Sequence, residues 1–125
     1  HKGFRAYPYI DEGAYRAAME EYTEASFFLS FMQKKPMGAV RLVDDAEIYL
    51  AGLCDVLGEL YRFALSAVAE RRFEDAERAH FAAYSLYTEL SLGEFTQYLR
   101  TKYDQARSVM HKLDELRAQI ALRNT

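Results

Sequence analysis

The sequence contains one cysteine, two prolines and no tryptophan among its 125 residues. Cys54 has no partner, so an internal disulfide is excluded and a reducing, cytoplasmic setting is expected. Pro8 and Pro36 both fall at predicted segment boundaries, so no proline interrupts the long segments of the chain. These absences favour a protein built from long, uninterrupted helices.

A large excess of charge of either sign is also lacking. The chain carries 16 Lys and Arg against 19 Asp and Glu, a net charge of -3, and its pI is near 5.6. This balance argues against a generally basic nucleic-acid coat, so any contact with phosphate must come from a local cluster of basic residues. A hydrophobic share of 50% predicts one folded domain over residues 1–125. Because the chain starts at His1 without a leader, we expect it to be part of a longer protein.

One long hydrophobic run is present, from Ile48 to Val68, with only Asp55, Glu59 and Arg62 charged. The run is long enough to span a membrane, but each central charge would cost roughly 2.5–3.5 kcal/mol there. We therefore interpret it as a buried core helix and expect no membrane partner. The three charges recur at steps of four and three residues, which places them on one strip of that helix.

Periodicity and capping signals predict an all-α bundle with short connections. Asp44 with Glu47 resembles a capping box, and Gly38–Val43 is the only stretch that alternates like a strand. Gly52 and Gly58 are predicted to allow close helix approach. The four expected helices run from about Asp11 to Gln33, from Asp44 or Asp45 to Glu70, from Phe73 to Leu92, and from Glu94 or Phe95 to Leu122.

Two of these helices carry a pair of acids on an otherwise apolar face. Glu21 and Glu24 interrupt the first helix at the centre of a regular stripe, while Asp55 and Glu59 interrupt the second. If the two helices are antiparallel neighbours, the four carboxylates can meet. Oxygen-only ligands suit Mg²⁺ or Mn²⁺, which can activate water and hold a phosphate. The alternative is that Glu21 is a solvated residue beside Glu20. The charged residues of the second helix would then form a buried internal ion-pair set of Asp55, Glu59 and Arg62. The full stripe is Ala14, Ala17, Glu21, Glu24, Phe28 and Phe31.

Four segments carry a resemblance to a known family. The sequence YLAGLCDVLGELYRFALSAV, Tyr49–Val68, closely resembles the "YLxGxxDLxGELxRxxxxxV" pattern of the translin family, in its translin-associated factor X branch. EYTEA, Glu21–Ala25, resembles the "EYVEA" motif of the same branch. Lys102–Asp104 and Ile120–Arg123 are weaker matches. The resemblance covers most of the chain and implies a translin-type helical bundle.

The resemblance also implies a function. That branch is similar to a metal-dependent endoribonuclease, the catalytic part of the component 3 promoter of RISC. Glu21, Glu24 and Asp55 carry over as catalytic acids, and Glu59 as a further metal ligand beside Glu24 and Asp55. The cofactor would be Mg²⁺ or Mn²⁺ and the substrate single-stranded RNA, with single-stranded DNA as a further ligand.

The family also implies partners. Its members assemble into a hollow, barrel-like octamer, so we expect self-association, as in archaeal relatives, or a translin-like partner subunit. Family members have further helices before the "EYVEA" helix, whereas only His1–Tyr9 precede it here. We therefore expect the family's N-terminal helices, and part of its RNA-binding surface, to be absent from this sequence.

Basic residues near these acids are candidates for holding an RNA backbone: Arg41, Arg62, Arg71 and Arg72. The alternative for Arg62 is an ion pair with Glu59, one turn earlier. For the others, the alternative is a solvated cluster that balances a helix dipole.

Three functions remain open from the sequence. The first is an RNA endonuclease, in which Glu21 is a metal ligand or the general base. The second is a non-catalytic translin-like scaffold that binds single strands. The third is a helical assembly domain whose acids are structural.

Overall fold

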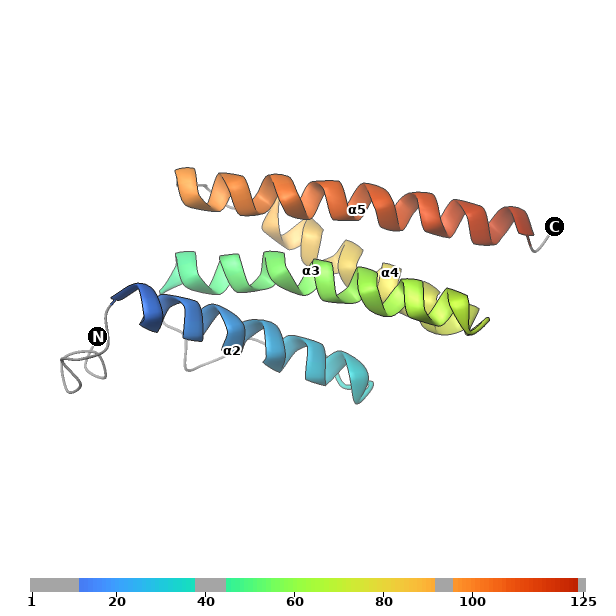
Figure 1. The fold of residues 1–125 in the computed structure, drawn as a ribbon, viewed down its shortest axis with the longest axis horizontal. Coiled ribbons are helices and arrows are strands. Elements are labelled where there is room, and N and C mark those ends of the chain that lie inside the picture. The colour runs from blue at the N-terminus through green and yellow to red at the C-terminus, as the bar shows by residue number, and fades with distance from the viewer. Residues whose placement is uncertain (1–11, 38–44, 92–95, 124–125) are drawn as a thin grey trace.

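The computed structural model describes residues 12–37, 45–91 and 96–123, and within these ranges the chain forms four α-helices and no strand. The predicted all-α bundle is therefore confirmed (Figure 1). The helices are α2 (Glu12–Met32), α3 (Ala46–Ala69), α4 (Phe73–Leu90) and α5 (Gln97–Arg123). The predicted stretch at Gly38–Val43, Asp44, and the helix boundary at Gly93–Phe95 lie outside the described residues.

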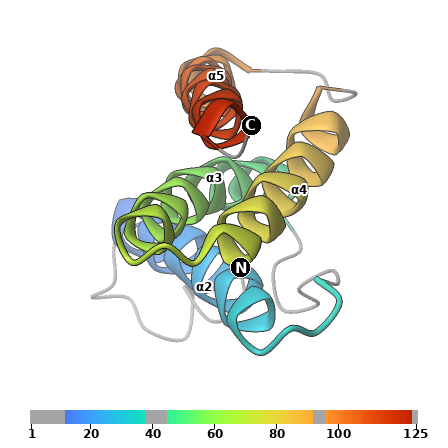
Figure 2. The same cartoon turned by 90° about the vertical axis from the view of Figure 1, so that its right-hand side faces the viewer.

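Helix α3 is the centre of the bundle. It packs against α2, α4 and α5, as the end-on view in Figure 2 shows. Ten of its residues are buried, and the side chains of Val56, Leu57 and Leu60 are completely inaccessible. The run that the sequence marked as a buried core helix has that role. None of the helices in the described ranges is long and apolar enough to cross a membrane.

Helices α2 and α3 run parallel, so the antiparallel arrangement in which the four carboxylates could meet is not adopted (Figure 1). Arg16 pairs with Glu47 near the start of both helices, and the rings of Phe31 and Phe63 lie 5.0 Å apart near the other end. The length of the connection permits this arrangement. At about 3.3 Å per residue, the residues between α2 and α3 are numerous enough to cover the roughly 32 Å of α2.

The last three helices alternate in direction along the chain. The stacked rings of Tyr87 and Tyr103 and the contact between His80 and Asp114 show that α4 and α5 are antiparallel. Helix α5 therefore runs in the same direction as α3, because α3 and α4 form a hairpin through residues 70–72. As a result, residues near the start of α2, α3 and α5 all lie at the same end of the bundle.

Local signals in the chain set the start of α3. The Asp45 carboxylate accepts hydrogen bonds from the backbone N–H groups of Glu47 at 2.9 Å and Ile48 at 3.2 Å. Asp45 is thus the N-cap of the helix, one of the two residues predicted for its start.

Two helices end in the same motif without glycine. Lys34 and Arg71 adopt positive φ angles of 57° and 61°. In each case the next residue's N–H reaches back into the helix, from Lys35 to Ser30 O at 2.9 Å and from Arg72 to Ala67 O at 2.7 Å. These are Schellman endings, which terminate the helices although the residue is not the usual glycine.

The two glycines of α3 have different roles. A Cβ atom on Gly52 would lie 2.6 Å from Cβ of Thr23 and 3.0 Å from the carbonyl oxygen of Glu20. Gly52 therefore permits the close approach of α2 and α3, as predicted. Gly58 has nothing within 4 Å of such an atom, so the same prediction is wrong for it.

Candidate functional site

A pocket of about 190 Å³ opens where α2, α3 and α5 meet. Helix α2 contributes Glu24, α3 contributes Asp55 and Glu59, and α5 contributes Lys102. The parallel packing of α2 and α3 brings the first of these acids beside the other two. The remaining lining residues are Cys54, Gly58, Arg62, Gln105, Ala106 and Val109.

The carboxyl group of Glu24 has a raised pKa because it is partly buried and the other acids of the pocket lie near it. Partial burial raises the pKa of its carboxyl above 4.5, and the negative charges of Asp55 and Glu59 raise it further. Arg62 works in the opposite direction but does not outweigh them. The pocket therefore holds negative charge that the chain's own cations do not fully balance around Glu24.

The other two acids of the pocket are held by basic residues. Lys102 Nζ donates to both carboxylate oxygens of Asp55, at 2.9 and 3.0 Å, and Arg62 forms an ion pair with Glu59. Burial would lower the pKa of Lys102, but its hydrogen bond with Asp55 and the charge of that carboxylate raise it. Lys102 is thus a firmly charged partner of Asp55.

The remaining predicted acid, Glu21, is exposed and is not among the residues that line the pocket. It contributes to the charge around Glu24. The predicted apolar stripe of α2 is wrong by one residue at three positions, since Glu20, Thr23 and Phe27 are buried in place of Glu21, Glu24 and Phe28. Phe31 is buried as predicted, whereas Ala14 and Ala17 are exposed. The two stripes share the same three- and four-residue steps, so periodicity alone could not choose between them.

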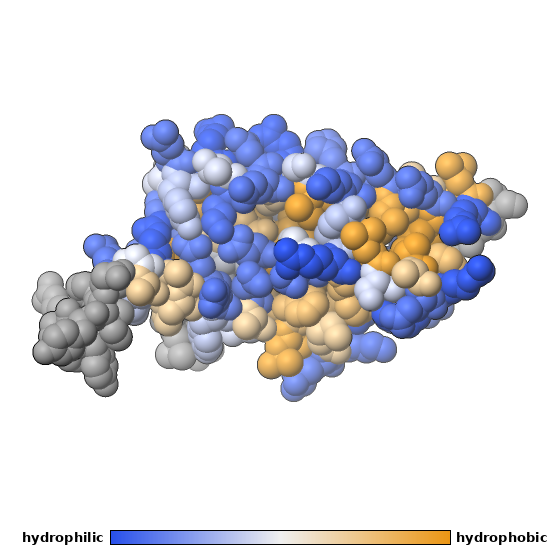
Figure 3. Space-filling view, in the orientation of Figure 1, coloured by the Kyte–Doolittle hydropathy of each residue, from blue (hydrophilic) through white to orange (hydrophobic). Residues whose placement is uncertain are grey.

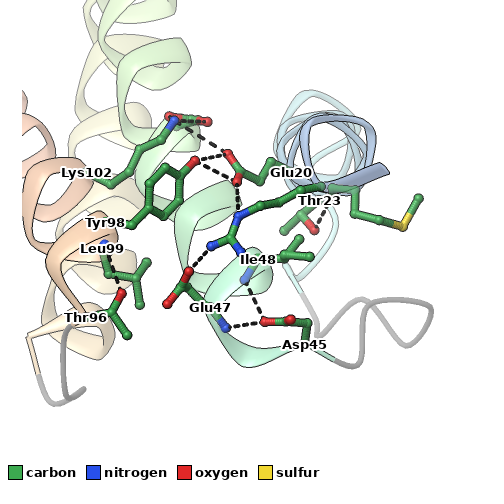
Figure 4. Close-up of polar contacts among 12 residues, drawn as sticks. Glu20, Thr23, Asp45, Glu47, Ile48, Thr96, Tyr98, Leu99 and Lys102 are labelled. Carbon is green, nitrogen blue, oxygen red and sulfur yellow. Dashed lines mark hydrogen bonds and ion pairs between the residues drawn. The ribbon is translucent and has the colours of Figure 1, made fainter. Parts of the chain in front are cut away.

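Glu20 is a buried acid near the pocket that was not predicted from the sequence. Glu20 is 7% exposed as a whole residue, and the Tyr98 hydroxyl donates to its two carboxylate oxygens at 2.9 and 2.7 Å (Figure 4). Lys102 Nζ lies 3.7 Å from one oxygen of Glu20, and Arg16 Nε lies 3.7 Å from the other. Lys102 therefore lies between two carboxylates, Asp55 on one side and Glu20 on the other. No local signal in the sequence separates Glu20 from its neighbour Glu21.

Cys54 also borders the pocket but takes no part in its charge balance. Burial, followed by the nearby charge of Asp55, raises the pKa of its thiol to about 12. The thiol stays protonated at neutral pH, so it is not a thiolate nucleophile. The prediction of a buried thiol is confirmed.

The predicted basic residues have separate surroundings. Arg62 is 74% exposed beside the pocket, in the predicted ion pair with Glu59. Arg72 bonds to Asp75 at 2.7 Å and to Glu70 at 3.3 Å, so it connects α3 to α4. Arg71 is exposed at the end of α3, and Arg41 lies outside the described residues. Figure 3 shows mostly hydrophilic groups on one face, with apolar groups gathered toward the C-terminal ends of α3 and α5.

A family model described as the translin family matches residues 3–124. The chain belongs to the translin family. Neither the curated proteins nor the solved structures contain a match. Membership indicates a nucleic-acid-binding scaffold, and in this translin-family chain the acidic pocket lies along α3, the helix that carries the longest family-like motif.

The donor chemistry of this translin-family pocket fits a hard divalent cation. Glu24, Asp55 and Glu59 offer only carboxylate oxygens, the ligands that Mg²⁺ and Mn²⁺ prefer. Across the described ranges, no three Asp, Glu, His or Cys side chains converge as a ready-made metal site. Two of the three carboxylates of the pocket instead form ion pairs, Asp55 with Lys102 and Glu59 with Arg62.

Replacing Glu24 with glutamine is expected to stabilise the protein at pH 7 but not at about pH 4. The folded state raises the pKa of Glu24 above 4.5, so its ionised form opposes folding at neutral pH. Stability contributed by this residue rises as the pH falls through the raised pKa and levels off below the unfolded value. Thermal unfolding midpoints of both proteins, measured with a chelator present at the two pH values, check this.

Glu21→Gln is the matched control, since it removes the same charge three residues earlier at an exposed position. It is expected to change the midpoint little at either pH. An equal effect of Glu24→Gln at both pH values would contradict the claim that the ionised Glu24 carboxylate destabilises the fold.

Proposed function

We propose that this protein is a metal-dependent endoribonuclease that acts on single-stranded RNA, in the translin-associated factor X-like branch of the family and akin to its archaeal homologues. The observation that carries the proposal is the gathering of Glu24, Asp55 and Glu59 around one open pocket, from two parallel helices. An acidic cluster with a raised carboxyl pKa is costly to the fold, which is typical of a site kept for chemistry.

In this proposal Glu24, Asp55 and Glu59 would hold Mg²⁺ or Mn²⁺. The cation would supply an activated water and a Lewis acid for the phosphodiester. Glu21, exposed three residues before Glu24 on the same helix, is the candidate general base or outer ligand. Arg62 is largely exposed beside the pocket, so its guanidinium can leave Glu59 to meet a backbone phosphate.

The proposed partners include a second subunit, either another copy or a translin-like protein. Helix α2 supports this, because its outward face is apolar: Tyr22, Leu29 and Met32 are 40%, 56% and 48% exposed. These residues lie opposite the buried stripe of the same helix. A cavity between subunits would then enclose the RNA near the acidic pocket.

A second candidate is a non-catalytic scaffold that binds single-stranded RNA or DNA. The ion pairs of Asp55 with Lys102 and of Glu59 with Arg62 favour it, because they give these acids a structural role without a metal. The two functions differ in their need for a cation at the pocket.

The test is the incubation of the purified protein with end-labelled single-stranded RNA in Mn²⁺ and in excess chelator. The endonuclease is expected to produce internal fragments only with Mn²⁺. RNA that is bound but remains intact in both conditions would favour the scaffold and overturn the endonuclease.

A further inference from the structure

Lys102 has two carboxylates within reach, those of Asp55 and Glu20, although one carboxylate is enough to balance its charge. It donates to both oxygens of Asp55, at 2.9 and 3.0 Å, while the nearer oxygen of Glu20 lies 3.7 Å from the same nitrogen (Figure 4). The side chain is 22% exposed, so it sits at the pocket wall and is not locked inside the core. A small displacement of the ammonium group can exchange one carboxylate for the other.

Glu20 is prepared to receive this ammonium group. Its carboxylate is buried and is held in place by Tyr98 from α5 and by Arg16 one turn earlier on α2. Tyr98 donates to both oxygens, which leaves a fixed acceptor facing Lys102. Burying a carboxylate between α2 and α5 lowers the stability of the fold unless hydrogen bonds and a positive charge compensate it. A cation beside Glu20 is therefore favourable.

Asp55, in contrast, belongs to the group of acids that lines the pocket. While Lys102 donates to both of its oxygens, the negative charge of this carboxylate is already balanced by the ammonium group, so a second cation is bound less strongly. The ammonium group and a divalent cation therefore compete for the same two oxygens.

We propose that Lys102 is a displaceable internal counter-ion, which holds Asp55 while the pocket is empty of metal and moves to Glu20 when a divalent cation binds. The inference rests on the proposed function, because it assumes that Asp55 is a metal ligand. Lys102 and Glu20 are positioning residues in this scheme, since both act through Asp55.

The test is Mn²⁺ binding measured by isothermal titration calorimetry, which needs no catalytic turnover. Lys102→Met removes the competitor, and the affinity is expected to become about tenfold tighter or more. Glu20→Gln removes the negative charge of the second acceptor, and the affinity is expected to weaken about tenfold, as is typical of residues that support a metal ligand from outside. In the double variant the Glu20→Gln effect should largely vanish, because there is no ammonium group left to receive.

Lys112→Met is the matched control. It removes the same charge from α5, ten residues later, where the ammonium group lies over the ring of Tyr61 and away from Asp55. Its Mn²⁺ affinity is expected to stay at the wild-type value. Circular dichroism checks that each variant is folded, and Lys102→Gln replaces Lys102→Met if the latter is not.

The outcomes distinguish a failure of the counter-ion role of Lys102 from a failure of the metal site. If the wild type binds Mn²⁺ but Lys102→Met does not tighten binding, or if Glu20→Gln weakens it equally with and without Lys102, the counter-ion role is overturned. If neither the wild type nor the Lys102 variants bind Mn²⁺, the proposed metal site fails, and the counter-ion role fails with it.

Discussion

Asp55→Asn is expected to lower the rate of single-stranded RNA cleavage by about 100-fold or more, while RNA binding remains close to that of the wild type. Asparagine keeps the volume of the side chain and one oxygen that can accept from Lys102, so the contact between α3 and α5 survives. It removes the negative charge that a metal ligand needs. Gel electrophoresis of a labelled RNA gives the cleavage rate, and fluorescence anisotropy gives the affinity.

Asp104→Asn supplies the control for this change. Asp104 lies on the exposed side of α5, bonded to Arg107 at 2.8 Å, and takes no part in the pocket. The same substitution there is expected to leave cleavage unchanged. Cleavage by Asp55→Asn at the wild-type rate would remove Asp55 from the proposed site, and parallel loss of binding and cleavage would point to a structural role.

Gly52→Ala is expected to lower the free energy of unfolding by about 2–3 kcal/mol, since overpacking outweighs the gain in helix propensity. The added methyl group would lie 2.6 Å from Cβ and 2.8 Å from Cγ2 of Thr23, whose side chain is fully buried. A Cβ atom cannot swing aside, so α2 must move away from α3. Glu24 would move with it, and RNA cleavage should fall as well. Urea unfolding followed by circular dichroism measures the stability change.

Gly58→Ala, six residues later in the same helix, is expected to raise the free energy of unfolding. No atom lies within 4 Å of the added methyl group, so the helix gains about 1 kcal/mol from the better propensity of alanine. If both variants shifted stability in the same direction, the close approach at Gly52 would not be the cause.

The helices themselves were predictable because each has a local cause. The apolar run from Ile48 to Val68 identified the central helix, and Asp45 was one of the two residues expected at its start. The relative direction of the first two helices was not predictable from such signals. The connection between them is long enough to permit either direction, and no periodicity in the helices encodes which one is adopted.

The candidate site was predictable only in part for a similar reason. Spacing placed Asp55, Glu59 and Arg62 on one strip, and the structure shows the expected ion pair of Glu59 with Arg62. The partners from α5 could not be anticipated, because Lys102 and Tyr98 reach the acids across the bundle. Glu20 and Glu21 are adjacent and chemically identical, so only packing decides which one is buried.

The most direct test of an endoribonuclease at this pocket uses circular single-stranded RNA, which has no ends for an exonuclease to attack. With Mn²⁺, the wild-type protein is expected to convert the circles first to unit-length linear RNA and then to shorter fragments, and Asp55→Asn is expected to leave them closed. Circles that stay intact with the wild-type protein in Mn²⁺, although the RNA is bound, would contradict the account.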